Sequence, residues 1–291
     1  MQSRSVSPLA RRLDWAFLAL LALVAVVFVH RALSTFNYDW NWGRAWEFIS
    51  TPNERFLGWS YFGFAILNTV KVCLLTAIFA LLGGALVGVM RTSRVPFFSL
   101  MSASYVYGMR NIPPLVFIFI FYFFITPQIL LLLPLEGLKG MLEGRELLQF
   151  LLVQPALLEN MLAAILSLAV LEGAFVAEVV RGGFQAVPKG QGEAAEALGL
   201  SAWQKLRFVL FPQVLRVVVP QLGNILVSIV KNTAIVSLIS VQELTFAAQE
   251  MANSSSLVFE IWLITAAIYW VLCVAIERAF KLLTQTRKSN A

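Results

Sequence analysis

The chain has 291 residues, of which 59% are hydrophobic and only 13% are charged, and its mean hydropathy is +0.78. These values lie far outside the range of water-soluble globular domains and indicate an integral membrane protein. The net charge of +6 would also suit a nucleic-acid ligand, but the basic residues are placed as in a membrane protein, so no nucleic-acid partner is expected.

Six stretches of the chain are long and apolar enough to cross a bilayer as a helix, which requires roughly 20 predominantly apolar residues. They cover residues 13–33, 64–90, 99–133, 158–180, 212–235 and 258–277. We therefore predict an all-α integral membrane protein with about six transmembrane helices.

The basic residues between these stretches are unequally divided between the two sides of the membrane. Thirteen fall on the side of the N-terminus: Arg4, Arg11, Arg12, Arg91, Arg94, Arg181, Lys189, Lys205, Arg207, Arg278, Lys281, Arg287 and Lys288. Five fall on the opposite side: Arg31, Arg44, Arg55, Lys139 and Arg145. Because cytoplasmic loops carry the excess of lysine and arginine, we predict that both termini are cytoplasmic.

The N-terminal region, residues 1–63, is predicted to hold a retained anchor helix and an outer loop. The sequence HRALSTF after the first span lacks a small-residue cleavage site, which argues against a signal peptide. Four of the eight tryptophans follow: Trp40, Trp42, Trp46 and Trp59. Indole rings favour membrane interfaces, so we expect an amphipathic segment at the outer interface. The alternative is contact with an external binding protein.

The second and third spans carry signals for packing and for a break. Gly84 and Gly88 form a G-x-x-x-G pattern, whose missing side chains allow close helix crossing. The third span is broken by the sequence GMRNIPP at 108–114, where a proline pair removes backbone donors. Polar backbone at membrane depth is tolerated only beside protein or a water-filled cavity, so the break is predicted to face a translocation path.

A polar loop at 182–212 separates the fourth and fifth spans and reads as two short helices. Pro188 can occupy the first turn of a helix that runs to Leu198, since a missing N–H costs nothing there. Gly199 can then adopt the left-handed conformation that satisfies the carbonyls at the end of a helix.

The second helix of this loop begins at Ser201, which has capping-box spacing to Gln204. Pro212 is expected to interrupt it before the next span. Residues 135–157 are predicted to be an outer loop with an interfacial helix.

The polar loop resembles the EAA signature of the permeases of ATP-binding-cassette importers. The resemblance is carried by Glu-Ala-Ala at 193–195, by Gly199 and by the ending VLFP at 209–212, in which valine and phenylalanine replace the usual isoleucine and leucine. It implies a type I importer permease core, in which the first loop helix is the coupling helix that sits in a groove of a separate ATPase subunit. The implied coupling residues are Gly190, Glu193, Ala194, Ala195, Leu198 and Gly199.

In this interpretation the two alanines allow close approach to another surface, while Glu193 supplies a charged contact. An interfacial amphipathic loop with no partner is the alternative.

Charged residues within membrane spans are costly and usually functional. The candidates are Lys71, Arg110, Glu172, Glu178, Arg216 and Lys231. Lys71 and Arg216 are predicted near span ends, where long side chains can reach the interface. Glu178 and Arg181 are three residues apart and can pair on one helix face.

The predicted translocation path consists of Arg110, Asn111, Glu172, Lys231, Asn232 and Thr233. We expect Arg110 and Lys231 to meet a substrate carboxylate, and Glu172 to pair with a cation or an ammonium group. The alternative is that these residues form buried ion pairs that hold the spans in register.

Three segments resemble the polar amino acid subgroup of these permeases: 110–123, 176–200 and 210–239. Asn111 and Ala234 depart from the commoner glycine and serine. The resemblance extends over a permease domain at 64–282, followed by a cytoplasmic tail at 283–291.

This resemblance implies a multi-pass subunit of the bacterial inner membrane that receives polar L-amino acids from a periplasmic binding protein. It would pair with an identical or sister permease and, embedded in membrane lipid, would dock on an ATPase dimer that hydrolyses the ATP.

The sequence contains no phosphate-binding G-x-x-x-x-G-K-[ST] motif, so this chain is expected to bind no cofactor itself. Cys73 and Cys273 lack metal-site spacing, and neither a metal site nor a catalytic residue is expected. An ion-driven secondary amino acid carrier is the main alternative function. It would explain the intramembrane charges but not the EAA-like loop. A structural membrane protein is a third possibility, and an enzyme is the least favoured.

Overall fold

The computed structural model describes the chain except for residues 1–7, 36–37, 53–57, 94 and 290–291. The described residues are helical apart from turns, loops and an isolated bridge between Pro52 and Ser60, which confirms the predicted all-α class. They form two compact units, Met1–Asn41 and Trp42–Ala291.

The first unit contains the helix α1, Pro8–Thr35. Its described apolar stretch, Leu13–Phe28, is shorter than the 18 residues that the other candidate spans reach. The predicted span at 13–33 is therefore helical, while its described apolar part is shorter than the prediction.

The second unit contains the remaining helices. In chain order they are α2 (Trp42–Ser50), α3 (Tyr61–Arg91), α4 (Pro96–Asn111), α5 (Pro114–Ile120), the π-helix η2 (Phe121–Ile125), α6 (Thr126–Leu130), α7 (Leu135–Leu142), α8 (Glu146–Leu151), the 3₁₀-helix η3 (Pro155–Leu157), α9 (Leu158–Ala186), α10 (Lys189–Ala197), α11 (Ala202–Gln204), the π-helix η4 (Lys205–Leu210), α12 (Phe211–Thr233), the 3₁₀-helix η5 (Ala234–Ile239), α13 (Leu244–Ser255) and α14 (Val258–Ser289).

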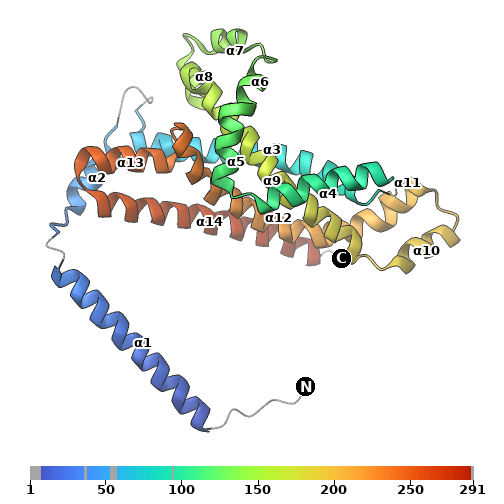
Figure 1. The fold of residues 1–291 in the computed structure, drawn as a ribbon, viewed down its shortest axis with the longest axis horizontal. Helices are drawn as coiled ribbons and strands as arrows, with labels where there is room; N and C mark the ends of the chain where they lie inside the picture. Colours follow the sequence, from blue (N-terminus) through green and yellow to red (C-terminus); the bar gives the residue numbers. More distant parts are fainter. Residues whose placement is uncertain (1–7, 36–37, 53–57, 94, 290–291) are drawn as a thin grey trace. The chain divides into compact units, whose positions relative to one another are not determined.

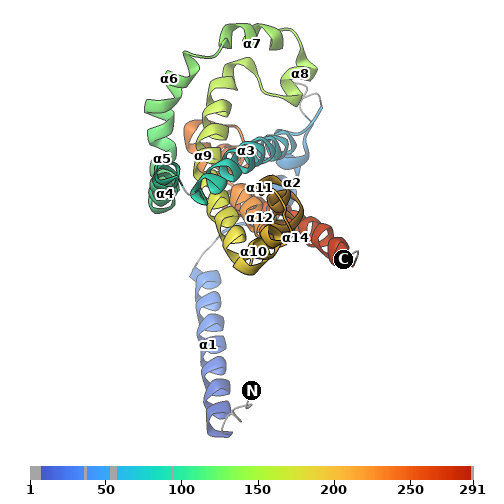
Figure 2. The same ribbon diagram turned by 90° about the vertical axis from the view of Figure 1, so that its right-hand side faces the viewer.

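The second unit carries four helical segments that are long and apolar enough to cross a membrane, and five if the bent pair of α4 with α5 and α6 counts as one. They correspond to the predicted spans from the second to the sixth. In Figures 1 and 2, α3, α12 and α14 lie close together, and α9 packs against both α3 and α12.

Helices α3 and α9 approach one another closely at the two glycines of the G-x-x-x-G pattern. A Cβ atom on Gly84 would lie 2.5 Å from the Gly173 carbonyl oxygen and 2.5 Å from Val176 Cβ. A Cβ atom on Gly88 would lie 2.7 Å from Val180 Cβ. Since side chains at these positions would collide with α9, the predicted packing role of the pattern is confirmed.

The third span is broken where the proline pair predicts a break. Helix α4 ends at Asn111, α5 begins at Pro114, and the two segments meet at an angle of 113°. Ile112 has an extended backbone, with φ −90° and ψ 132°. A residue before proline disfavours the helical region because its atoms collide with the proline ring, and this local restriction accounts for the break.

The outer loop predicted at 135–157 contains the two short helices α7 and α8, which stand apart from the bundle in Figures 1 and 2. Lys139 on α7 donates a hydrogen bond of 2.7 Å to Glu159 at the start of α9. This contact raises the pKa of the Lys139 amine. The ion pair connects the loop to the first turn of α9.

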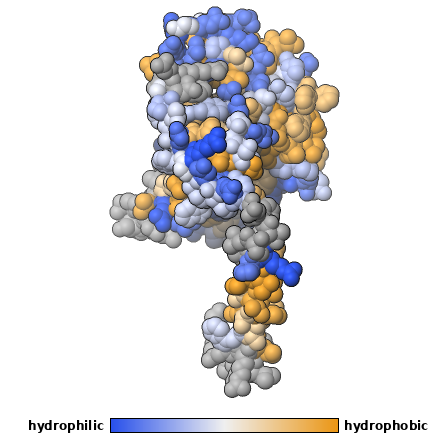
Figure 3. Space-filling model, turned by 90° about the vertical axis from the view of Figure 1, so that its left-hand side faces the viewer, coloured by the Kyte–Doolittle hydropathy of each residue, from blue (hydrophilic) through white to orange (hydrophobic). Residues whose placement is uncertain are grey.

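Helix α2 is amphipathic, as predicted for the tryptophan-rich segment. Ala45 on one face is fully buried among residues of α3, α13 and α14, while Trp42 and Trp46 are exposed. In Figure 3, hydrophilic residues gather over the end of the unit that carries α2 and α13, and hydrophobic residues gather along one flank. A membrane-spanning bundle with one end in water has this distribution.

Candidate functional site

The polar loop at 182–212 folds into the two predicted helical parts, α10 and α11 with η4. Pro188 lies one position earlier than predicted, as the residue before the first turn of α10. Gly199 has φ +74°, and the N–H of Leu200 donates to the Ala195 carbonyl at 3.1 Å. The left-handed glycine thus satisfies a terminal carbonyl of α10, which confirms that prediction.

The predicted capping box at the start of α11 is also present. The Ser201 hydroxyl accepts from the Gln204 N–H at 3.3 Å, and the Gln204 side chain accepts from the Ser201 N–H at 2.9 Å. An ion pair between Lys205 and Glu196 joins the two helices of the loop. These contacts give the loop a defined shape before any partner binds.

The prediction that Pro212 interrupts the second loop helix is wrong, because the chain stays helical from α11 through η4 into α12. The N–H of Phe211 donates to the Leu206 carbonyl, five residues earlier. Proline lacks an N–H and collides with the carbonyl of the residue four positions before it in a regular helix. The wider π-turn before Pro212 accommodates the ring, so the helix continues.

The implied coupling residues differ in accessibility. Gly190, Glu193, Ala194, Leu198 and Gly199 are exposed, with Leu198 80% exposed. Ala195 is only 2% exposed, so it packs within the loop and leaves Ala194 as the alanine that another surface can reach.

Exposed apolar side chains enlarge this surface beyond the predicted residues. Trp203 and Phe208 are both 65% exposed on α11 and η4. The sequence of the loop does not reveal that these two side chains are exposed, since their exposure depends on how the two loop helices pack against each other.

Glu172 lies at the contact between α9 and α12. It is 1% exposed, and its Oε1 accepts hydrogen bonds from Asn232 Nδ2 at 2.6 Å and from Ser228 Oγ at 3.2 Å. Its Oε2 atom is buried without a hydrogen-bond partner among the described residues. The structure thus supplies Glu172 with a partner, Asn232, that lies 60 positions away in the sequence.

The other predicted path residues of α12 lie in different environments. Lys231 is exposed and forms no ion pair with the described residues. Thr233 is fully buried and donates to the Val230 carbonyl at 2.7 Å. Of these three residues, Asn232 is the one that donates a hydrogen bond to Glu172.

Of the two residues predicted near span ends, Arg216 is exposed on α12. Lys71 donates to Asn68 Oδ1 at 3.1 Å and to the Phe150 carbonyl. Lys71 therefore connects α3 to α8.

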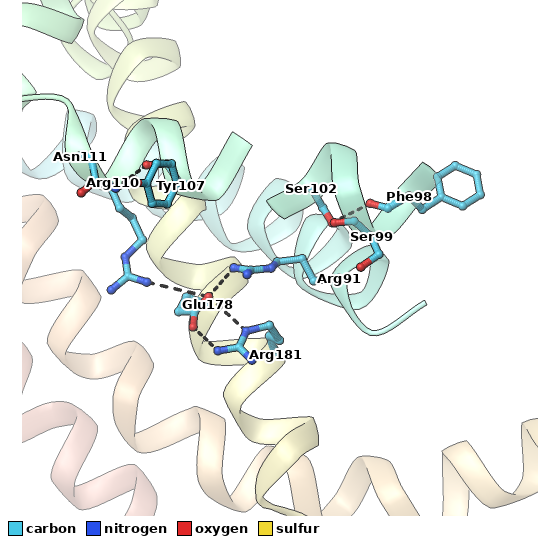
Figure 4. Close-up of polar contacts among 9 residues, drawn as sticks. All are labelled: Arg91, Phe98, Ser99, Ser102, Tyr107, Arg110, Asn111, Glu178 and Arg181. Atoms are coloured by element: carbon cyan, nitrogen blue, oxygen red, sulfur yellow. Dashed lines mark hydrogen bonds and ion pairs between the residues drawn. The ribbon is translucent and has the colours of Figure 1, made fainter. Parts of the chain in front are cut away.

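Glu178 is the centre of an arginine cluster, which Figure 4 shows. Arg181 donates from Nε to Glu178 Oε2 at 3.2 Å and from Nη2 to Glu178 Oε1. The predicted pairing of these two residues on one helix face is therefore confirmed. Arg91, from the last turn of α3, donates from Nη1 to the same carboxylate. Arg110, at the end of α4, lies 3.9 Å from it and 5.5 Å from the centre of the Phe175 ring.

This cluster includes one predicted path residue, Arg110, and one residue that was not predicted to lie on the path, Arg91. The cluster opens onto a cleft of about 330 Å³, whose polar lining residues are Arg91, Tyr107, Arg110, Asn111 and Glu178 itself. We call this cavity the arginine cleft.

A second, larger pocket of about 550 Å³ lies beside the break in the third span. Leu115 on α5 lines it, together with residues of η5, α13 and α14. Its polar lining side chains are Ser237, Thr245, Gln249 and Asn253. None of these was predicted, because small uncharged polar residues in a helical sequence carry no signal of facing a cavity. The two pockets have no lining residue in common.

The chain is similar to several transport permeases. Residues 80–289 match the family described as the binding-protein-dependent transport system inner membrane component. The chain is 32% identical over 225 residues to the glutamate/aspartate import permease protein GltJ of Escherichia coli (strain K12), covering 77% of this chain and 85% of GltJ. It is 31% identical over 236 residues to the probable glutamine ABC transporter permease protein GlnP of Bacillus subtilis (strain 168), covering 80% of this chain and 95% of GlnP.

Solved structures show the same architecture. The crystal structure of an amino acid ABC transporter with histidines matches with a TM-score of 0.61 and 29% sequence identity, over 78% of this chain and 94% of that chain. The MetNI methionine ABC transporter matches with a TM-score of 0.51 and 17% identity, over 74% of this chain and 92% of that chain, and so supports the fold alone. The chain therefore has the type I permease fold, belongs to the family of binding-protein-dependent transport permeases, and is a permease subunit of an ATP-binding-cassette importer.

Proposed function

We propose that this permease imports polar amino acids and that α10 docks on a separate ATPase subunit. The substrate class is supported by relatives named for glutamate and aspartate, for glutamine, and for nopaline. The named amino acids share an α-ammonium and an α-carboxylate group, so a common path can recognise them without discriminating their side chains.

The observation that carries the docking proposal is the ordered, exposed surface of α10. Glu193, Ala194 and Leu198 lie within six positions of one another and are all exposed. Because Gly199 and the Ser201 cap hold the loop in shape, docking requires little additional ordering, which lowers the entropic cost of association.

The excess of basic residues places the loop and both termini in the cytoplasm in this proposal. A periplasmic binding protein would then deliver substrate at the end that carries α2 and α13. A second permease, identical or sister, would complete the path, and membrane lipid would surround the apolar flank.

In the substrate path we propose distinct roles for the residues of α9 and α12. Lys231 is exposed and available to a substrate carboxylate. Glu172 and Asn232 hold α12 against α9 beside that position, and the unpartnered Oε2 of Glu172 can accept from an ammonium group when the helices separate. Thr233, at the end of α12, supports the change to the 3₁₀-helix η5.

The large pocket beside Leu115 forms the adjoining part of this path in the proposal. Closure of the ATPase subunits would shift the population of the bundle between inward-open and outward-open states, because each state binds its partners with a different affinity.

The test is co-purification of the ATPase from membranes of the source organism with the wild-type permease and with Glu193→Lys. We expect the variant to recover at most a tenth as much ATPase as the wild type. Glu143→Lys is the matched control, since Glu143 is an exposed residue of the loop predicted on the opposite side. Equal recovery with both variants would contradict docking through α10.

A second measurement separates the importer from an ion-driven carrier. Uptake into proteoliposomes that contain the complete transporter should require ATP and persist when ion gradients are collapsed. Uptake that continued without ATP and stopped with the gradient would indicate the carrier.

A further inference from the structure

The arginine cluster around Glu178 carries more positive charge than its carboxylate can balance. Arg181 binds both oxygens of Glu178, and Arg91 binds one of them. With Arg110 nearby, three guanidinium groups surround one carboxylate (Figure 4), which leaves two positive charges in excess within the described cluster. One arginine is enough to neutralise one carboxylate in a structural ion pair, whereas this cluster contains three.

Arg110 is the arginine that Glu178 holds least closely. Its Nη1 atom lies 3.9 Å from the carboxylate, beyond hydrogen-bond distance, and its side chain is 42% exposed. The guanidinium lies over Phe175 and lines the arginine cleft. Arginine is suited to bind phosphate because its planar group presents several donors in a fixed fork.

The cleft offers further polar groups at the same place. Asn111 lines it and uses its Nδ2 to donate to the Tyr107 carbonyl at 2.6 Å. Arg91 lines its other side. A volume of about 330 Å³ accommodates a phosphate group with a small alcohol attached.

One face of α4 leads away from the cleft and is largely apolar. It carries four residues that lie three or four positions apart: Leu100, Ala103, Tyr107 and, at the cleft itself, Arg110. Leu100 is 71% exposed and Tyr107 is 77% exposed. This face is placed to contact a hydrocarbon chain whose charged head lies between Arg91 and Arg110.

The location of the cleft also fits a lipid ligand. Arg91 is the last residue of α3, an apolar helix of 31 residues, so the cleft lies toward the end of a membrane span. The orientation proposed above makes this the cytoplasmic end. Basic pockets between transmembrane helices on that side of a membrane recognise anionic lipid headgroups.

We propose that the arginine cleft binds the phosphate group of an anionic phospholipid, with an acyl chain along the Leu100 face of α4. The proposal rests on the proposed orientation for its choice of leaflet. It assigns Arg110 to a lipid phosphate and leaves the substrate carboxylate to Lys231. Free phosphate offers the same recognition chemistry without the chain, and the experiment distinguishes the two.

The test uses the assembled transporter in detergent and measures its thermal unfolding with added phosphatidylglycerol, phosphatidylcholine or sodium phosphate. We expect phosphatidylglycerol to raise the wild-type midpoint by roughly 5 °C, the size that a ligand at saturating concentration produces. Phosphatidylcholine and sodium phosphate should produce less than a fifth of that shift.

The decisive variant is Arg110→Gln, which leaves both ion pairs of Glu178 with Arg91 and Arg181 in place. It should lose most of the shift with phosphatidylglycerol, and Arg110→Lys should retain part of it. Arg216→Gln, which removes an exposed arginine of α12 outside the cluster, should retain the full shift. Native mass spectrometry should detect one fewer phosphatidylglycerol per chain in Arg110→Gln, which separates lost binding from altered folding.

The proposal is overturned if Arg110→Gln keeps the wild-type shift and the bound lipid, or if Arg216→Gln loses as much as Arg110→Gln. A shift of equal size with sodium phosphate would identify a soluble anion as the ligand and would exclude the lipid. None of these outcomes depends on ATPase recovery, so the lipid site and the docking surface fail independently.

Discussion

The close contact between α3 and α9 predicts a large difference between alanine substitutions at two neighbouring glycines. A Cβ atom on Gly84 would lie 2.5 Å from Gly173 O and from Val176 Cβ, whereas carbon atoms pack at roughly 3.5–4.0 Å. Gly84→Ala therefore forces the helices apart by about 1 Å, and overpacking of this kind typically costs about 1–3 kcal/mol.

The matched control is Gly83→Ala, since a Cβ atom on Gly83 meets nothing within 4 Å. Alanine there stabilises by about 0.4–1 kcal/mol, because it restricts the unfolded chain. We expect the midpoint of thermal unfolding in detergent to be roughly 5–10 °C lower for Gly84→Ala than for Gly83→Ala. Midpoints within about 1 °C of each other would refute the inferred contact.

Three further predictions concern the buried carboxylate and the loop. Glu172→Ala should lower the free energy of unfolding by about 1–3 kcal/mol, since it leaves the half-buried amide of Asn232 without its acceptor. Glu172→Gln should lower it by less, as measured by thermal unfolding. Gly199→Ala should lower the free energy of unfolding by about 1–2 kcal/mol, because a φ of +74° is strained for alanine, and it should also reduce ATPase recovery. Gly192→Ala, which has open space at its Cβ, should change neither quantity in this way. Ala195→Glu should lower the unfolding midpoint because Ala195 is buried, whereas Ala194→Glu should leave the midpoint unchanged and reduce only ATPase recovery in co-purification.

Features that depend on a few neighbouring residues were predictable from the sequence. The proline pair at 113–114 breaks the third span because each proline restricts the residue before it. Gly199 ends α10 and Ser201 begins α11 through hydrogen bonds that reach no farther than five residues. Glu178 pairs with Arg181 because helix geometry brings positions three apart together.

Features that depend on which helices become neighbours were not predictable from one sequence. Arg91 meets Glu178 across 87 positions, and Asn232 meets Glu172 across 60. These residues belong to three helices, α3, α9 and α12. Hydropathy marked all three as apolar spans but contains no information on their packing partners.

The local rule for proline failed at Pro212 for a related reason. A proline inside an apolar helix can be accommodated by a wider turn when tertiary packing keeps the chain helical, and the sequence around Pro212 does not reveal that choice. The two alanines of the EAA signature are likewise identical in sequence terms, and only the folding of the loop buries Ala195 and exposes Ala194.

The sequence by itself determined the membrane class, the break in the third span and the turn between the two helices of the polar loop, because hydrophobicity and backbone restrictions act over short distances. The tertiary structure alone decided the excess charge of the arginine cluster, the partners of Glu172 and the walls of both pockets. Those features arise where side chains from separate helices converge, and convergence is set by the packing of whole helices at positions such as Gly84.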